Sequence, residues 1–129
     1  MKVKLRGRLA AEFLGTAFLV AAVVGSGTMA ERLSGGTFGL ALLTNTVATR
    51  AALAALILAF GPISGAHLNP VVTLASAWER ALPPRETPAY IAVQLSGGIA
   101  GTAGAHLMFG LLLSCRRNLQ PGEFRLDPC

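Results

Sequence analysis

The chain has 129 residues, of which 53% are hydrophobic and 13% are charged, and its formal net charge is +5. Ordinary soluble domains contain about 25% charged residues, so this composition indicates a membrane protein rather than a water-soluble one. The positive charge does not indicate nucleic-acid binding, because the sequence shows no basic face with interleaved aromatic residues.

The N-terminal basic residues suggest how the chain enters the membrane. Lys2, Lys4, Arg6 and Arg8 directly precede the first apolar run, and positive residues of this kind stay on the cytoplasmic side. A cleaved signal peptide is the alternative, but this run is longer than a typical signal peptide core and other apolar runs follow it. We therefore expect a retained helix in a multi-pass protein of the cell membrane, with a cytoplasmic N-terminus.

Three apolar runs are long enough to cross about 30 Å of hydrocarbon as helices. They cover residues 9–29, 38–60 and 89–113. A short outer turn is expected at residues 31–36, and a re-entrant loop and half-helix at residues 61–81. The predicted fold is therefore an all-α membrane domain over residues 1–113, with three transmembrane helices and one re-entrant half-helix.

The segment that follows the second run combines a turn with a helix start. Ser64 and Gly65 interrupt the apolar run, Asn69 can cap a new helix, and Pro70 suits the first helical position. The new helix, from Val71 to Trp78 or at most Ala81, is too short to span the bilayer. Its N-terminus would lie near the middle of the membrane, together with about half a positive charge and free N–H groups.

The residues of this segment resemble the aquaporin and glycerol-facilitator family, also called the major intrinsic proteins. The family motif SG-x-H-x-NPA-V-T appears as Ser64-Gly65-Ala66-His67-Leu68-Asn69-Pro70-Val71-Val72-Thr73, with Val71 in place of alanine. Ala11 to Thr16 also match the first helix of the family. The resemblance covers roughly residues 8–112, the N-terminal half of a family member, and implies one repeat of the aquaporin-type inverted pair.

A member of this family conducts water or small uncharged solutes passively, so no enzyme activity, cofactor or metal is expected. The resemblance implies pore-lining residues, among them Asn69, whose amide meets the solute, although Asn69 also fits a simple helix cap. Pro70 and Val71 complete the tip of the half-helix. The carbonyl groups that would form a ladder of hydrogen-bond acceptors belong to Gly65, Ala66, His67 and Leu68. The His67 ring is expected to brace the loop.

Two further positions carry expectations from the resemblance. Glu12 matches a glutamate that supports the pore loops, although it also lies four residues from Arg8 and near the interface. Thr49 lies where the family places a constriction residue, and its small side chain suits glycerol-sized or metalloid-acid solutes. Arg50 departs from the family, in which a small or apolar residue is expected here, and a charge in the middle of a span costs about 2.5–3.5 kcal/mol on insertion scales.

Small residues in the third run predict close helix packing. Gly97 and Gly101 form a GxxxG pair, and the facing surface expected on the second run consists of Ala51, Ala52, Ala54 and Ala55.

Residues 114–129 resemble nothing in the family, and we expect a disordered or frameshifted tail. Arg116, Arg117 and Arg125 would lie outside, against the positive-inside tendency, while Cys115 and Cys129 lack the spacing of a metal site or disulfide framework.

A truncated, inactive half-channel is the favoured interpretation, and a natural half-length protein is its alternative. The alternative from a different class of function is a small helical membrane subunit that assembles with or modulates another membrane protein without conducting. The bilayer and small neutral solutes are the expected partners, and homo-oligomer formation is left open.

Overall fold

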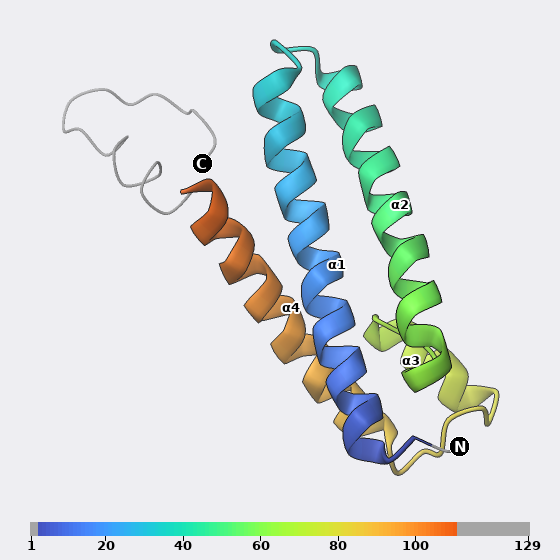
Figure 1. The fold of residues 1–129 in the computed structure, drawn as a ribbon. Helices are drawn as coiled ribbons and strands as arrows, with labels where there is room; N and C mark the ends of the chain where they lie inside the picture. Colours follow the sequence, from blue (N-terminus) through green and yellow to red (C-terminus); the bar gives the residue numbers. More distant parts are fainter. Residues whose placement is uncertain (1–2, 111–129) are drawn as a thin grey trace, which may run out of the picture.

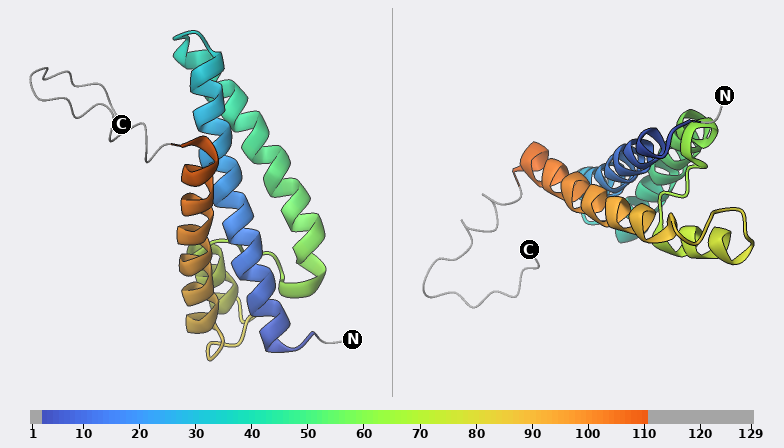
Figure 2. Two further views of the ribbon diagram at one scale, coloured as in Figure 1. Left: turned by 60° about the vertical axis from the view of Figure 1, so that its left-hand side comes forward. Right: turned by 90° about the horizontal axis from the view of Figure 1, so that it is seen from below.

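The computed structural model describes residues 3–110 and is entirely helical over that range. In chain order the helices are α1 (Leu5–Leu33), α2 (Phe38–Ser64), α3 (Pro70–Trp78) and α4 (Thr87–Phe109). α1 lies between α2 and α4, and the short α3 packs against α4 (Figures 1 and 2). The predicted all-α class is confirmed.

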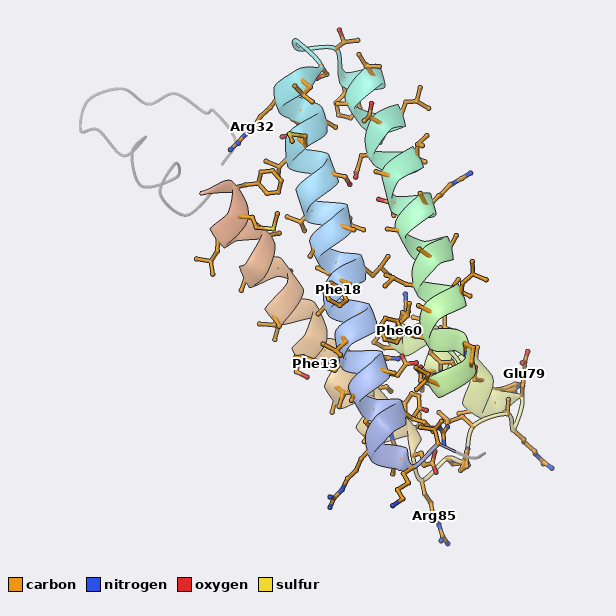
Figure 3. All side chains as sticks on the ribbon, viewed as in Figure 1. Phe13, Phe18, Arg32, Phe60, Glu79 and Arg85 are labelled. Atoms are coloured by element: carbon orange, nitrogen blue, oxygen red, sulfur yellow. The ribbon has the colours of Figure 1, made fainter. Side chains whose placement is uncertain are left out.

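Two of these helices, α1 and α2, are long and apolar enough to cross a membrane, by length and composition. α4 has 23 residues but does not reach the same apolarity within residues 87–109, because its glycine, threonine, serine, glutamine and histidine side chains dilute the aliphatic ones. Among the labelled charged side chains, Arg32 lies at one end of the bundle and Glu79 and Arg85 lie at the other (Figure 3). Phe13, Phe18 and Phe60 lie between them.

The helices are longer than the predicted runs. α1 continues to Leu33 and α2 to Ser64, so the turn expected from residue 31 and the loop expected from residue 61 both begin later. Pro62 does not end α2, because a proline removes only its own N–H donor and the residues after it still donate. The helix ends at Ser64. The Gly65 N–H still bonds the Gly61 carbonyl 3.0 Å away, and the φ of +94° at Gly65 then turns the chain out of the helix.

The remaining bounds also differ from those expected. α3 ends at Trp78 rather than Ala81. α4 begins at Thr87, two residues before the predicted start, because Pro88 is tolerated in the first helical turn. Residues 111–113 of the third predicted span lie outside the described residues, as do residues 114–129 with their two cysteines and three arginines.

The glycine pair of α4 packs against α1. A Cβ atom on Gly97 would lie 2.5 Å from the Phe13 carbonyl oxygen, and one on Gly101 would lie even closer to the Ala17 carbonyl. The two backbones therefore meet directly, as the GxxxG spacing predicts. The expected partner surface was wrong, since α2 packs along α1 and meets α4 through the hydrogen bond from the Tyr90 hydroxyl to the Ser64 carbonyl rather than through these alanines.

Candidate functional site

The loop between α2 and α3 has an unusual backbone. Gly65, Ala66 and Leu68 all have positive φ angles, of +94°, +48° and +51°. This left-handed conformation suits glycine and costs other residues roughly 1–2 kcal/mol each. These backbone angles turn the N–H groups of His67 and Leu68 toward Glu12 of α1. The carbonyl oxygens of residues 65–68 accept no hydrogen bond from any residue of the described range.

Glu12 of α1 receives the N–H groups of the loop. Its Oε1 accepts from the Ser64 hydroxyl at 2.7 Å and the His67 N–H at 3.0 Å, and its Oε2 accepts from the Leu68 N–H and the Gln94 amide, both at 2.8 Å. The side chain is fully buried. Four donors match the roughly four acceptor positions of a carboxylate. Glu12 thus makes the contacts expected of a loop support.

A second set of buried polar groups links the loop to α3 and α4. Gln94 Nε2 also donates to the Thr73 hydroxyl at 2.9 Å, and that hydroxyl donates to the Asn69 carbonyl at 3.1 Å. His67 Nδ1 lies 3.2 Å from the same hydroxyl, and its ring lies 5.5 Å from that of Tyr90. The His67 ring therefore has the contacts of a brace. The supporting roles of Gln94 and Thr73 were not predicted from the sequence, although a lone glutamine within an apolar run was a usable signal.

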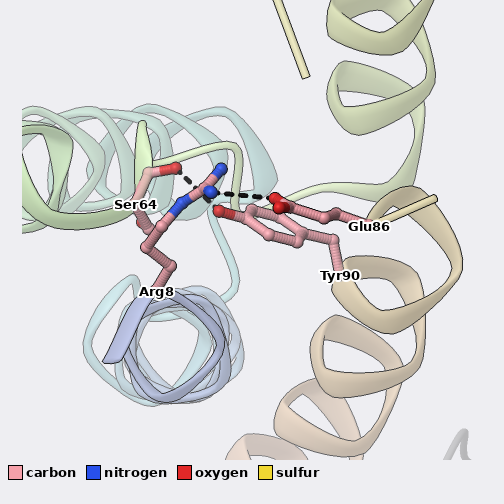
Figure 4. Close-up of polar contacts among 4 residues, drawn as sticks. All are labelled: Arg8, Ser64, Glu86 and Tyr90. Atoms are coloured by element: carbon pink, nitrogen blue, oxygen red, sulfur yellow. Dashed lines mark hydrogen bonds and ion pairs between the residues drawn. The ribbon is translucent and has the colours of Figure 1, made fainter. Parts of the chain in front are cut away.

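A partly exposed cluster closes the end of the bundle where α1 begins. Arg8 pairs with Glu86 at 2.8 Å, with both side chains one quarter exposed, and its guanidinium lies 5.3 Å from the centre of the Tyr90 ring (Figure 4). The Tyr90 hydroxyl donates to the Ser64 carbonyl at 3.2 Å. Arg8 is thus engaged by Glu86 rather than by Glu12, the partner considered from the helical spacing.

The tip of α3 carries Asn69 and Pro70. The Asn69 Oδ1 accepts from the Val71 N–H at 2.8 Å, so this residue is a helix cap as the sequence allowed. Within residues 3–110 its NH₂ group makes no hydrogen bond, and the side chain is exposed. The loop bonds to Glu12, seven residues into α1, which places the tip about 10 Å from the start of that helix.

A groove of about 920 Å³ opens beside this tip, between α1 and α4. Leu68, Asn69 and Pro70 lie at one end of the groove, and its walls are mostly aliphatic. The polar groups on the walls belong to Thr16, Gln94, Thr102 and His106. Thr16 Oγ1 is buried and lacks a hydrogen-bond partner among the described residues.

The remaining predicted pore residues do not line this groove. Gly65, Ala66, His67 and Val71 lie outside it, although Val71 is exposed at the tip of α3. Thr49 is directed to a different place, because its hydroxyl donates to Asn45 Oδ1 at 3.4 Å. Asn45 in turn accepts from Ser26 of α1 at 2.7 Å. The structure therefore separates Thr49 from the groove that receives Asn69.

Arg50 is exposed and makes no hydrogen bond or ion pair with any described residue. Glu12, the acidic residue buried within the bundle, is occupied by four other donors. The charge in the middle of α2 is therefore uncompensated within residues 3–110.

Comparison with known proteins finds one family. A profile of the major intrinsic proteins matches residues 1–122. The aquaglyceroporin AqpS of Rhizobium meliloti (strain 1021) is 54% identical over 104 residues, which are 81% of this chain and 44% of that protein. The aquaporin NIP1-4 of Oryza sativa subsp. japonica is 44% identical over 103 residues, or 79% of this chain and 36% of that protein. This chain therefore spans less than half the length of these relatives.

Proposed function

The chain belongs to the major intrinsic protein family, a family of membrane channels and not enzymes, and on that premise we propose that it forms one half of a passive channel. This half consists of three transmembrane helices, α1, α2 and α4, and one re-entrant half-helix, α3. The complete channel conducts water or small uncharged solutes. The lipid bilayer and those solutes are its partners.

The observation that carries the proposal is the orientation of the loop that Glu12 holds. Two N–H groups of the loop are bonded to a buried carboxylate, while the carbonyl oxygens of residues 65–68 have no donor within the described range. Irregular backbone is tolerated at membrane depth where it lines a cavity or is buried in protein. A row of free acceptors beside the free NH₂ group of Asn69 supports a path along which a neutral solute exchanges hydrogen bonds.

Charge selection follows from the same geometry. The N-terminus of α3 carries the positive end of its helix dipole, and Asn69 adds amide donors at that point. Both features disfavour cations and suit neutral molecules with oxygen atoms. The resemblance implies a constriction at Thr49, which lies outside the groove beside Asn69, and its short side chain would leave that constriction wide enough for glycerol-sized or metalloid-acid solutes.

One repeat supplies only one half-helix. In inverted-repeat transporters the binding site lies near the midplane, where discontinuous helices from both repeats meet. The open groove beside Asn69, about 920 Å³ in volume, supports the need for a second half. We therefore expect residues 1–129 alone to form an inactive half. The four basic residues before α1 support a cytoplasmic N-terminus in the cell membrane.

A chimaera tests this function. Residues 1–110 replace the segment of AqpS that they match, and the product is reconstituted in proteoliposomes for stopped-flow measurement of water and glycerol flux. We expect flux above that of empty liposomes from the chimaera and background flux from residues 1–129 alone. Asn69→Asp should suppress the flux of the chimaera, because an anion replaces the amide at the tip of α3.

Glu79→Gln serves as the control, because Glu79 is an exposed residue after the C-terminus of α3. An inserted, folded chimaera without flux contradicts the proposal. Flux that Asn69→Asp leaves unchanged removes Asn69 from the conduction path.

A further inference from the structure

Tyr90 lies between the partly exposed end of the bundle and the loop that follows α2. Its side chain is fully buried, and its ring lies 5.5 Å from the His67 ring. Its hydroxyl donates to the Ser64 carbonyl at 3.2 Å, and the Arg8 guanidinium lies 5.3 Å from the centre of its ring (Figure 4). Tyr90 therefore connects the pair of Arg8 and Glu86 to the point where α2 ends.

The peptide group between Ser64 and Gly65 is fixed at both of its polar atoms. Its carbonyl accepts from the Tyr90 hydroxyl, and its N–H donates to the Gly61 carbonyl at 3.0 Å. No other residue of the described range donates to the Ser64 carbonyl. Because a peptide group is planar, these two bonds together determine the orientation of the plane.

The next three peptide groups are fixed through their N–H groups instead. The Ala66 N–H donates to the Ser64 hydroxyl at 3.2 Å, and the N–H groups of His67 and Leu68 donate to Glu12. All peptide bonds of the described residues are trans, so each carbonyl points away from the N–H of its own plane. The carbonyl groups of residues 65–67 are therefore directed away from the groups that hold the loop.

Gly65 joins the plane that is held by its carbonyl to the planes that are held by their N–H groups. Its φ is +94°, and glycine changes its backbone angles with little steric resistance. The backbone at this residue does not by itself keep the first free carbonyl in place. Without the Tyr90 bond, the plane before Gly65 would be held at its N–H alone and could rotate.

We propose that Tyr90 is a positioning residue of the channel, which sets the direction of the free carbonyl groups of residues 65–68 and thereby the relative flux of glycerol and water. It does so by holding the Ser64 carbonyl and by packing against the His67 ring. This inference rests on the proposed function. A glycerol molecule has three hydroxyl groups that need acceptors at the same time, and each donor left unpaired in a narrow path costs free energy. Misdirected carbonyl groups therefore impede glycerol more than water.

Tyr90→Phe in the chimaera with AqpS tests the effect on flux. The substitution keeps a ring beside His67 and removes the hydroxyl. We expect the ratio of glycerol to water permeability, measured by stopped-flow, to fall about fivefold, which is the effect of one net hydrogen bond. Gly35→Ala is the control, because it strains the turn before α2 at a φ of +57° and should leave the ratio unchanged. An unchanged ratio in a conducting Tyr90→Phe chimaera overturns the proposal, as does an equal fall in Gly35→Ala.

Amide hydrogen exchange tests the positioning of the loop without conduction. The full chain and its Tyr90→Phe variant are compared by NMR in micelles. We expect the N–H groups of Ala66, His67 and Leu68 to exchange about fivefold faster in the variant, while that of Gly97, where α4 meets α1, stays unchanged. Faster exchange confined to the loop supports the proposal even if no chimaera conducts, an outcome that would contradict the proposed function alone. Unchanged exchange in the loop, or equal acceleration at Gly97, overturns the proposal.

Discussion

The two connections on either side of α2 adopt left-handed backbone by different means. In the connection before α2, residues 34–37, which we call the outer turn, the positive φ angles belong to Gly35 and Gly36. The Thr37 N–H bonds the Ser34 carbonyl within the same turn. In the connection after α2, residues 65–69, which we call the inner loop, two of the positive φ angles belong to Ala66 and Leu68. The N–H groups of His67 and Leu68 bond Glu12, more than fifty residues earlier.

This difference separates a turn that its own sequence specifies from a loop that the fold specifies. Glycine adopts positive φ without a steric penalty, so the outer turn needs no distant contact. The inner loop holds alanine and leucine in a conformation that each disfavours, and the bonds to Glu12 stabilise it. Backbone strain of this kind persists where surrounding structure over-determines it, which is common at functional sites.

The largest effect is expected from Glu12→Leu. The substitution leaves the donors of Ser64, His67, Leu68 and Gln94 buried without their acceptor, and each such donor costs about 1–3 kcal/mol. We expect a loss of more than about 3 kcal/mol, measured as the free energy of unfolding in SDS titrations of micellar protein followed by circular dichroism. Glu31→Leu, next to the outer turn, should change it by less than about 0.5 kcal/mol. Equal losses in the two variants would mean that the inner loop does not depend on Glu12.

A smaller loss is expected from Gly15→Ala. A Cβ atom there would overlap the Leu68 side chain of the inner loop and lie 3.3 Å from the Phe60 ring. Overpacking of a buried site costs about 1–3 kcal/mol, and the flexibility of Leu68 favours the lower half of that range. Gly39→Ala, in the first turn of α2, meets nothing within 4 Å and should stabilise slightly. The same titration measures both, and a neutral Gly15→Ala would show that the loop can move away from α1.

A third pair of variants should give opposite signs. Gly35→Ala adds a side chain at a φ of +57° in the outer turn and should destabilise by about 1 kcal/mol. Ala66→Gly removes the side chain from a residue at +48° and should be neutral or stabilise by a few tenths of a kcal/mol, because the gain offsets the entropy that glycine loses on folding. Thermal unfolding in detergent measures the order of stability of the two variants and the unchanged chain. A strongly destabilising Ala66→Gly would indicate that the alanine methyl group packs in a way that the backbone geometry does not reveal.

The local features of the structure followed from the sequence. Asn69 and Pro70 start a short helix because cap and first-position preferences act within a few residues, and Gly97 and Gly101 mark a close helix contact. The end of α2 at Ser64 was predicted less accurately, because proline near the end of a helix removes one bond without breaking the helix.

Contacts between distant residues were not accessible in the same way. The position of Thr49 relative to Asn69, the partner of the α4 glycines and the bonds from Gln94 to Glu12 and Thr73 all depend on how helices pack. The resemblance gave a supporting role to Glu12, but only the structure identified the four donors. Arg50 shows the limit most clearly, because the sequence marked its charge as anomalous without saying which surface carries it.

The smallest effect is expected from Glu86→Gln, which removes the ion pair beside the inner loop. Both partners are one quarter exposed, and pairs of this kind contribute about 0–1 kcal/mol because water and salt screen them. Arg8 would keep its position over the Tyr90 ring, so we expect a loss of about 0.5 kcal/mol that shrinks as salt is added. Unfolding titrations at two salt concentrations measure this loss. The Tyr90→Phe variant, which lacks the bond to the Ser64 carbonyl, is measured in the same way for comparison. A loss above about 2 kcal/mol would mean that the exposed pair, and not the buried carboxylate of Glu12, holds the inner loop in place.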